Sequence, residues 1–422
     1  MSGLRGMFLI VRRSLRQHAV STIITAIGVA LGCGLLMSVF ALQQQTEDAF
    51  TAGNTGFDAV VGARGSQLQL VLNSVFHLEQ SPGNISWKRY TDIANDRRIK
   101  EAIPYAVGDN YKGFRIIGTV PKLFTKHELG EGVTFEFASK HGRVFDEYLG
   151  EAVIGSFVSQ QTGMNVGSTF NSYHGMTFDE KQKHDIEFTV VGVLKPTNTP
   201  ADRAIWIPLE AYFRMPGHAL QGSGTVYKPQ PGVAIPEEHK EVSAVMIRFT
   251  NTRHAVGMNY EVNRGSSDLT MAWPISSIMS DLFRKVGWVQ NVLQLVAYMV
   301  IVVAACSIVA GLYNSMNERR REFAILRALG ARRAMVFGAI VFESATIAAI
   351  GCVLSYGVYA TLLAVTAWVV RSETGVVIEM VRWHPIMVIA PVACIVLGAV
   401  VGMIPAAKAY GTDVATNLVP AT

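Results

Sequence analysis

Residues 314–333 read NSMNERRREFAILRALGARR and lie between two long apolar runs, 293–312 and 335–370. Each run is long enough to cross a bilayer core, which takes about 20 apolar residues. The stretch between them is the densest cationic segment of the chain, with Arg319, Arg320, Arg321, Arg327, Arg332 and Arg333. Arginine-rich loops stay on the cytoplasmic side of a membrane. The sequence therefore predicts two membrane helices joined by a cytoplasmic loop.

Two further apolar runs extend this pattern in both directions. The run 20–42 follows Arg5, Arg12, Arg13 and Arg16 and is too long for the apolar region of a signal peptide. No small-x-small cleavage site follows it, so we interpret it as an uncleaved anchor with a cytoplasmic N-terminus. The run 385–407 ends at Lys408, which begins a cytoplasmic tail. The distribution of arginine and lysine agrees at every crossing.

The predicted fold is a four-helix membrane protein with a large α+β extracytoplasmic domain between the first and second spans. The expected segments are a cytoplasmic amphipathic helix at 1–16, membrane helices at 17–43, 291–313, 334–370 and 385–408, the outer domain at 44–290, a cytoplasmic coupling loop at 314–333, an outer loop at 371–384 and a cytoplasmic tail at 409–422.

Composition supports a membrane protein. Half of the 422 residues are hydrophobic and only 16% are charged, whereas soluble domains carry about 25%. The net charge of +5 comes without a basic stripe of interleaved aromatics, which argues against nucleic-acid binding. All four cysteines lie inside apolar runs, so no disulfide framework or CxxC zinc motif is expected.

The outer domain shows period-two alternation in EFTVVGVL (187–194) and SAVMIRFT (243–250), which is typical of strands. Its ends, 43–50 and 276–290, have a helical pattern with few glycines or prolines, which favours two helical stalks over flexible linkers. Eight of the ten histidines lie here, but none has metal-type spacing and no GxSxG occurs. We expect no catalytic residue, metal or cofactor in this chain.

The loop 314–333 has the pattern of a short amphipathic helix, with apolar residues three apart and a glycine as C-cap. Such a helix either lies on the membrane surface or presents anchors to a partner protein. The candidate contact residues are Glu318, Arg319, Arg321, Glu322, Phe323, Ile325, Leu326, Arg327, Leu329 and Gly330.

These residues carry a resemblance to a known family. The segment 318–331 resembles the loop after the second span of FtsX/MacB-type ABC permeases, and the likeness continues at 342–344 and 404–409 and, in the outer domain, at 151–155, 165–170 and 188–194. The resemblance implies that the loop helix docks into a groove on an ATPase subunit. It also implies an assembly of two permeases, as a homodimer or with a related paralogue, and two ATPases.

The chain has no GxxxxGK[ST] motif, so the ATPase, with its ATP and magnesium, is expected to be a separate polypeptide. We expect a permease subunit of the cell inner membrane, not an enzyme, that transmits motion to its outer domain for export or extraction of an envelope substrate or lipoprotein. The alternative is a regulatory protein that activates an extracytoplasmic enzyme such as a cell-wall hydrolase. The corresponding outer partner is a periplasmic adaptor, a lipoprotein or a cell-wall enzyme.

Glu343 is a carboxylate inside the third apolar run. An acid at membrane depth is costly and often functional. Two interpretations remain open: a functional intramembrane group, or a near-interface acid paired with an arginine of the preceding loop.

Overall fold

The computed structural model describes residues 3–51, 55–130, 132–175, 178–215, 224–230, 233–328, 331–375, 377 and 383–410, with the backbone alone at 3–7, 49, 317–324, 326, 328 and 409. The chain forms two compact units. The membrane unit comprises Met1–Thr46, Val286–Trp368 and Glu379–Thr422. The outer unit comprises Glu47–Lys285 and Val369–Ile378.

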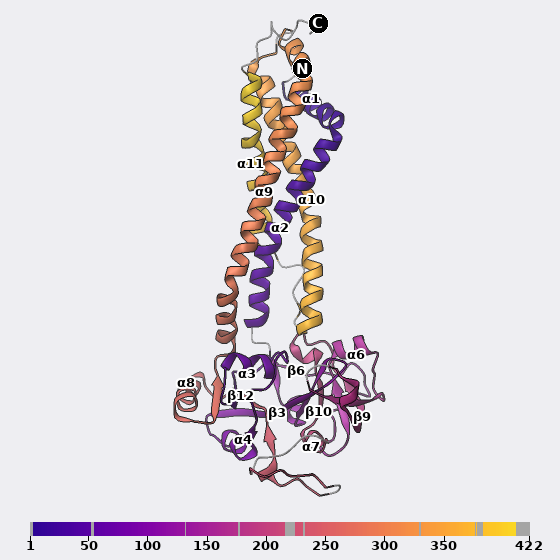
Figure 1. The fold of residues 1–422 in the computed structure, drawn as a ribbon, viewed down its shortest axis with the longest axis vertical. Helices are drawn as coiled ribbons and strands as arrows, with labels where there is room; N and C mark the ends of the chain where they lie inside the picture. Colours follow the sequence, from indigo (N-terminus) through magenta and orange to yellow (C-terminus); the bar gives the residue numbers. More distant parts are fainter. Residues whose placement is uncertain are drawn as a thin grey trace. The chain divides into compact units, whose positions relative to one another are not determined.

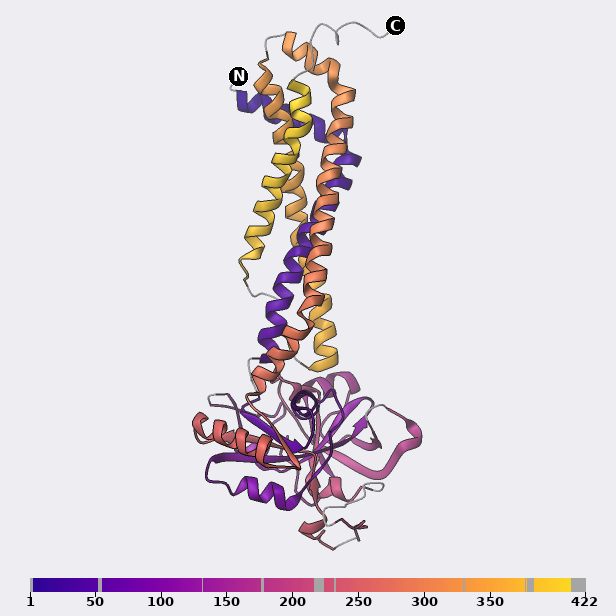
Figure 2. The ribbon, with the colours of Figure 1, turned by 60° about the vertical axis from the view of Figure 1, so that its left-hand side comes forward.

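Within the described residues, four helices are long and apolar enough to cross a membrane, at Ala19–Asp48, Ile275–Met316, Arg333–Thr374 and Ile386–Lys408. They belong to α2 (Ala19–Thr51), α9 (Ile275–Ala328), α10 (Arg333–Thr374) and α11 (Ile386–Tyr410). A shorter helix, α1 (Gly3–Gln17), precedes them. Figures 1 and 2 show the parts of these helices in the membrane unit running beside one another. The predicted fold class is confirmed.

Glycines allow the membrane helices to approach closely. A Cβ at Gly351 of α10 would lie only 2.6 Å from Val29 Cβ of α2. A Cβ at Gly398 of α11 would lie 2.6 Å from Ala348 Cβ of α10. Small residues at such crossings bring two backbones into van der Waals contact, which is how helices associate where lipid supplies no hydrophobic drive.

The outer unit is built on one nine-stranded sheet of order β13-β1-β12-β3-β4-β10-β7-β9-β8. Its strands are β1 (Ala59–Ala63), β3 (Ile99–Tyr111), β4 (Phe114–Thr119), β7 (Glu151–Ile154), β8 (Thr169–His174), β9 (Lys183–Val193), β10 (Ile205–Pro208), β12 (Ala244–Phe249) and β13 (Leu269–Ala272). Short pairs add β2 (Ile85–Ser86) with β11 (Glu241–Val242), and β5 (Glu128–Gly130) with β6 (Val133–Thr134). The alternating segments 187–194 and 243–250 fall on β9 and β12, as predicted.

Part of the sheet closes on itself. The last strand, β8, also pairs with β3, where Asp109 lies opposite His174 and Asn110 lies opposite Tyr173. Strands β3, β4, β10, β7, β9 and β8 therefore form a closed barrel, while β12, β1 and β13 continue as an open sheet. The long β3 serves both parts because its register shifts between Val107 and Asp109, and such a bulge bends a strand.

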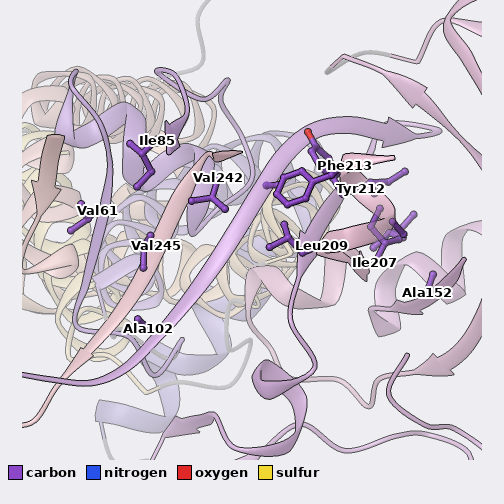
Figure 3. Packing of buried hydrophobic residues seen from close by; sticks show 14 of the residues in the cluster. Val61, Ile85, Ala102, Ala152, Ile207, Leu209, Tyr212, Phe213, Val242 and Val245 are labelled. Carbon is purple, nitrogen blue, oxygen red and sulfur yellow. The ribbon is translucent and has the colours of Figure 1, made fainter. Parts of the chain in front are cut away.

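Short helices cover the sheet and complete two hydrophobic clusters. They are α3 (Gln67–Ser74), α4 (Trp87–Ala94), α5 (Lys122–Thr125), α6 (Ser156–Thr162), α7 (Leu209–Phe213) and α8 (Thr252–Tyr260). Figure 3 shows part of one cluster, in which Val61, Ala102 and Val245 come from neighbouring strands and Leu209, Tyr212 and Phe213 come from α7. The mixed α+β character predicted for this domain is confirmed.

The third apolar run, 335–370, is longer than the roughly 20 residues of one perpendicular span, and the structure accounts for the excess. The end of α10, from Val369, belongs to the outer unit, where Val370 packs against a hydrophobic cluster. The guanidinium of Arg371 lies 5.9 Å from the Phe157 ring centroid, and Arg203 donates a hydrogen bond to the Glu373 carbonyl. The expected outer loop at 371–384 thus begins as helix, up to Thr374.

Candidate functional site

The predicted coupling segment is the C-terminal part of a single long helix. The backbone of α9 runs without interruption for 54 residues from Ile275 to Ala328, so residues 314–328 are helical continuously with the second span. Ile325 is 43% exposed and Arg327 is half-buried. Leu329 and Gly330 lie outside the described residues, as do the side chains of Glu318, Arg319, Arg321, Glu322, Phe323 and Leu326. Their assignment to an ATPase contact stays a prediction.

The structure pairs the intramembrane acid with a helix that the sequence analysis did not connect to it. Glu343 of α10 is buried and accepts a hydrogen bond from the hydroxyl of Ser14 in α1. Ser14 and Val11 are both buried, whereas Phe8 on the same helix is 59% exposed. The N-terminal helix therefore packs into the membrane unit along one face, with the Glu343 carboxylate as its polar contact.

The segment 60–84 holds the edge of the sheet in place. It contributes β1 and α3, and Gln67 donates to the Met271 carbonyl of β13 at 2.8 Å. Beyond the helix, Asn73 donates to the Glu79 carbonyl at 2.8 Å, which closes the following turn. These contacts give the segment a structural role that its composition did not reveal.

His77 follows α3 in a strained conformation. Its φ of 59° lies in the left-handed region, which non-glycine residues rarely occupy. Nδ1 lies 3.3 Å from the Asn73 carbonyl oxygen, and the ring meets Trp206 edge-on at 5.8 Å. Burial lowers the pKa of His77 to about 4, and the charges of Arg115 and Arg203 act in the same direction. His77 is therefore neutral at physiological pH.

His127 is fully buried and lies beside a carboxylate. Nδ1 lies 2.7 Å from a Glu101 carboxylate oxygen, and Nε2 lies 2.7 Å from the Thr55 carbonyl oxygen. The ring therefore bridges the Glu101 carboxylate and the Thr55 backbone. Burial, the largest single influence, raises the pKa of Glu101, but the hydrogen bond from His127 and the nearby charges of Lys122 and Arg248 together outweigh it and leave the pKa below its ordinary value. The pair joins Thr55, just after α2, to β3.

One group in the described part of the chain brings together three side chains of metal-ligand type. Asp109, His174 and His184 each offer an atom, and these atoms lie within 4.8 Å of one another. They come from β3, β8 and the start of β9. Sequence reasoning missed them because their separations along the chain match no ligand motif. Only the pairing of β8 with both β3 and β9 brings them together.

Two models of known protein families match the chain. Residues 22–245 match the model described as MacB-like periplasmic core domain, and residues 295–414 match FtsX-like permease C-terminal. The first match alone covers more than half of the 422 residues. The chain belongs to the FtsX/MacB-type ABC permeases, and it is a membrane protein with a large extracytoplasmic domain, the outer unit.

Solved structures include the periplasmic region of MacB from Actinobacillus actinomycetemcomitans, which is 11% identical, with a TM-score of 0.32. That likeness covers 54% of this chain and 94% of the other. None of the curated protein sequences matches the chain significantly.

Proposed function

We propose that this chain couples ATP hydrolysis by a separate ATPase subunit to motion of its outer unit, and that this motion exports or extracts an envelope substrate or lipoprotein. The observation that carries the proposal is the continuity of α9. Its first residues, Ile275 and Met279, are buried in a hydrophobic cluster of the outer unit. Its last turns hold the arginine-rich segment expected in the cytoplasm. One helix thus contributes residues to the outer unit and to the arginine-rich segment, the two parts that the mechanism must connect.

A continuous helix suits mechanical coupling. Every residue within it is tied to the next turn by i to i−4 hydrogen bonds, so a displacement at one end is not absorbed as it is in a flexible linker. Helix α10 supports the same mechanism, because it begins at Arg333, the last residue of the arginine-rich segment, and extends to residues that pack in the outer unit. Both helices that border the coupling segment therefore extend into the outer unit.

The membrane spans offer little for an ion pathway. Glu343 is the only charged residue in the four apolar runs 20–42, 293–312, 335–370 and 385–407. A conducting route through a bilayer is normally lined by several polar or ionisable groups. The single carboxylate supports a mechanical device in preference to a channel.

The family supplies the rest of the proposed assembly. Two permease copies, identical or paralogous, hold two ATPases, which bind the ATP and magnesium. A periplasmic adaptor, lipoprotein or cell-wall enzyme meets the outer unit. The chain lies in a cell inner membrane, with its arginine-rich segment in the cytoplasm.

The proposal is tested by Leu326→Glu. A charge at an apolar anchor of a small desolvated interface typically costs more than the ~1–4 kcal/mol lost on truncation, so the ATPase should dissociate. The full chain is purified from membranes in nanodiscs, and the amount of co-purified ATPase and its ATP turnover are measured. The matched control is Leu149→Glu, the same change at a leucine that is 53% exposed in the outer unit.

We expect Leu326→Glu to insert normally but to lose both the ATPase and the stimulated turnover, while Leu149→Glu retains both. If Leu326→Glu keeps the ATPase at wild-type levels, the segment is not the coupling element. A membrane-surface role for the loop helix would then replace the one proposed.

A further inference from the structure

Three side chains converge where the barrel of the outer unit closes. Asp109 of β3 lies directly opposite His174 of β8 in the antiparallel register, and His184 begins the neighbouring strand β9. The Asp109 oxygens lie 3.3 Å from His174 Nδ1 and 3.2 Å from His184 Nε2. Asp109 is fully buried and His184 nearly so. A carboxylate so deeply buried requires strong compensation of its charge.

The distances suit a shared metal ion better than direct hydrogen bonds. Charge-assisted N–H···O bonds to a carboxylate are usually about 2.7–2.9 Å long, shorter than either contact. Two ligand atoms bound to Zn²⁺ at about 2.0–2.1 Å with tetrahedral angles lie about 3.3–3.4 Å apart. The observed contacts, 3.3 Å from Asp109 Oδ1 to His174 Nδ1 and 3.2 Å from Asp109 Oδ2 to His184 Nε2, are close to that spacing. All three ligand atoms lie within 4.8 Å of one another.

The backbone around the three residues is held in place. Asn110, next to Asp109, donates to the carbonyls of Tyr173 and Gly175 at 3.3 and 3.0 Å, which fixes β3 against β8. Asn171 donates to the His184 carbonyl at 3.2 Å, which fixes β8 against β9. The side chain of His174 is 50% exposed, so the group is open to solvent on one side. A metal ion thus has a preorganised set of ligands and an entry path.

We propose that Asp109, His174 and His184 bind a divalent transition-metal ion of the zinc type. Two imidazoles and one carboxylate favour Zn²⁺ and its neighbours over Ca²⁺ and Mg²⁺, which prefer oxygen ligands alone. The three protein ligands leave a fourth position on the His174 side for water or for a group from outside. The bound ion joins three strands across the closure of the barrel, and it places a positive charge at the surface of the outer unit.

The test uses the full chain in nanodiscs, carrying a tag without histidines and freed of metal by chelation. Isothermal titration with ZnCl₂ is compared for the wild type, His174→Ala and Asp109→Asn. His141→Ala is the matched control, because this histidine is exposed in the outer unit and lies outside the group. We expect one tight zinc per wild-type chain, at least tenfold weaker binding in the two site variants and unchanged binding in the control.

Folding is checked separately, since a misfolded variant would also lose zinc. Because His174 is half exposed, His174→Ala should unfold without zinc at the same temperature as the zinc-free wild type. Zinc should then raise the midpoint of the wild type and of His141→Ala, but not that of His174→Ala. If zinc binds all four proteins alike, or raises no midpoint, the three residues are an ion-pair group and the proposal is wrong.

Discussion

At the scale of single residues, His77 shows how a half-buried titratable group makes the stability of the outer unit depend on pH. Its pKa of about 4 in the folded chain compares with about 6.5 in an unfolded one. Between these values the unfolded state binds more protons, so the free energy of unfolding rises with pH in this window. The contribution of His77 to the free energy of unfolding is fully present above pH 6.5 and is lost as the pH falls towards 4.

We predict that His77→Asn removes this acid sensitivity. Asparagine tolerates a left-handed conformation, and its amide can donate to the Asn73 carbonyl as the imidazole does. On lowering the pH from 7.5 to 4.5, the wild type should lose up to about 2.5 kcal/mol through this one group, and the variant none of it. Thermal unfolding of the solubilised chain at both pH values measures the difference. Equal pH slopes for the two proteins would show that His77 does not titrate as described.

Glu343 marks the limit of what single residues in a sequence reveal. Its charge inside an apolar run was visible at once. Its partner Ser14, 329 positions away, was not, because the contact depends on how α1 packs on α10. The same holds for Asp109, whose two histidine neighbours depend on the closure of the barrel. Chemistry-bearing residues can be recognised from sequence, but their convergence is a property of the tertiary fold.

At the scale of elements, the membrane unit depends on the crossing of α2 and α10. Gly351 approaches both Val29 Cβ and the Ala26 carbonyl oxygen, which a Cβ would meet at 2.6 and 2.8 Å. By contrast, a Cβ at Gly357, less than two turns further along α10, would have no neighbour within 4 Å. The two glycines lie on the same helix and differ in whether another helix packs against them.

We predict that Gly351→Leu destabilises the membrane unit by about 1–3 kcal/mol, since overpacking forces the helices apart. Gly357→Leu is the control and should be neutral or slightly stabilising, because leucine is the better helix former. Unfolding of both variants in mixed micelles by added SDS, followed by circular dichroism, gives the comparison. Equal sensitivity of the two variants would mean that α2 and α10 do not cross at Gly351.

Elements were predictable where one physical rule dominates. Apolar length identified all four spans, because a bilayer admits few alternatives. Alternation identified β9 and β12. The ends were less predictable: α9 extends through the expected loop to Ala328, and α10 extends through the first residues of the expected outer loop. Where a helix ends depends on packing in the outer unit, as at Val370. The local sequence carries no signal for this packing.

At the scale of the whole molecule, the order of one span, a large domain and three further spans follows from the sequence, and the family matches agree with it. The topology within the outer unit does not follow. Its closed barrel rests on two residue pairs between β8 and β3, which are about 60 positions apart in the chain. Long-range pairings of this kind carry no local signature, so the α+β class could be predicted but the barrel could not.

The central claim is that ATP in the cytoplasm moves the outer unit. The most direct measurement is the distance between spin labels at Tyr148 in the two permease copies, with the co-purified ATPase bound. Tyr148 is 76% exposed, and a genetically encoded label leaves the native cysteines in place. We predict that ATP with vanadate shifts the distance distribution by several ångströms, and that Leu326→Glu abolishes the shift. The account would be contradicted if the distance distribution were the same without nucleotide and with ATP and vanadate, although the bound ATPase hydrolyses ATP.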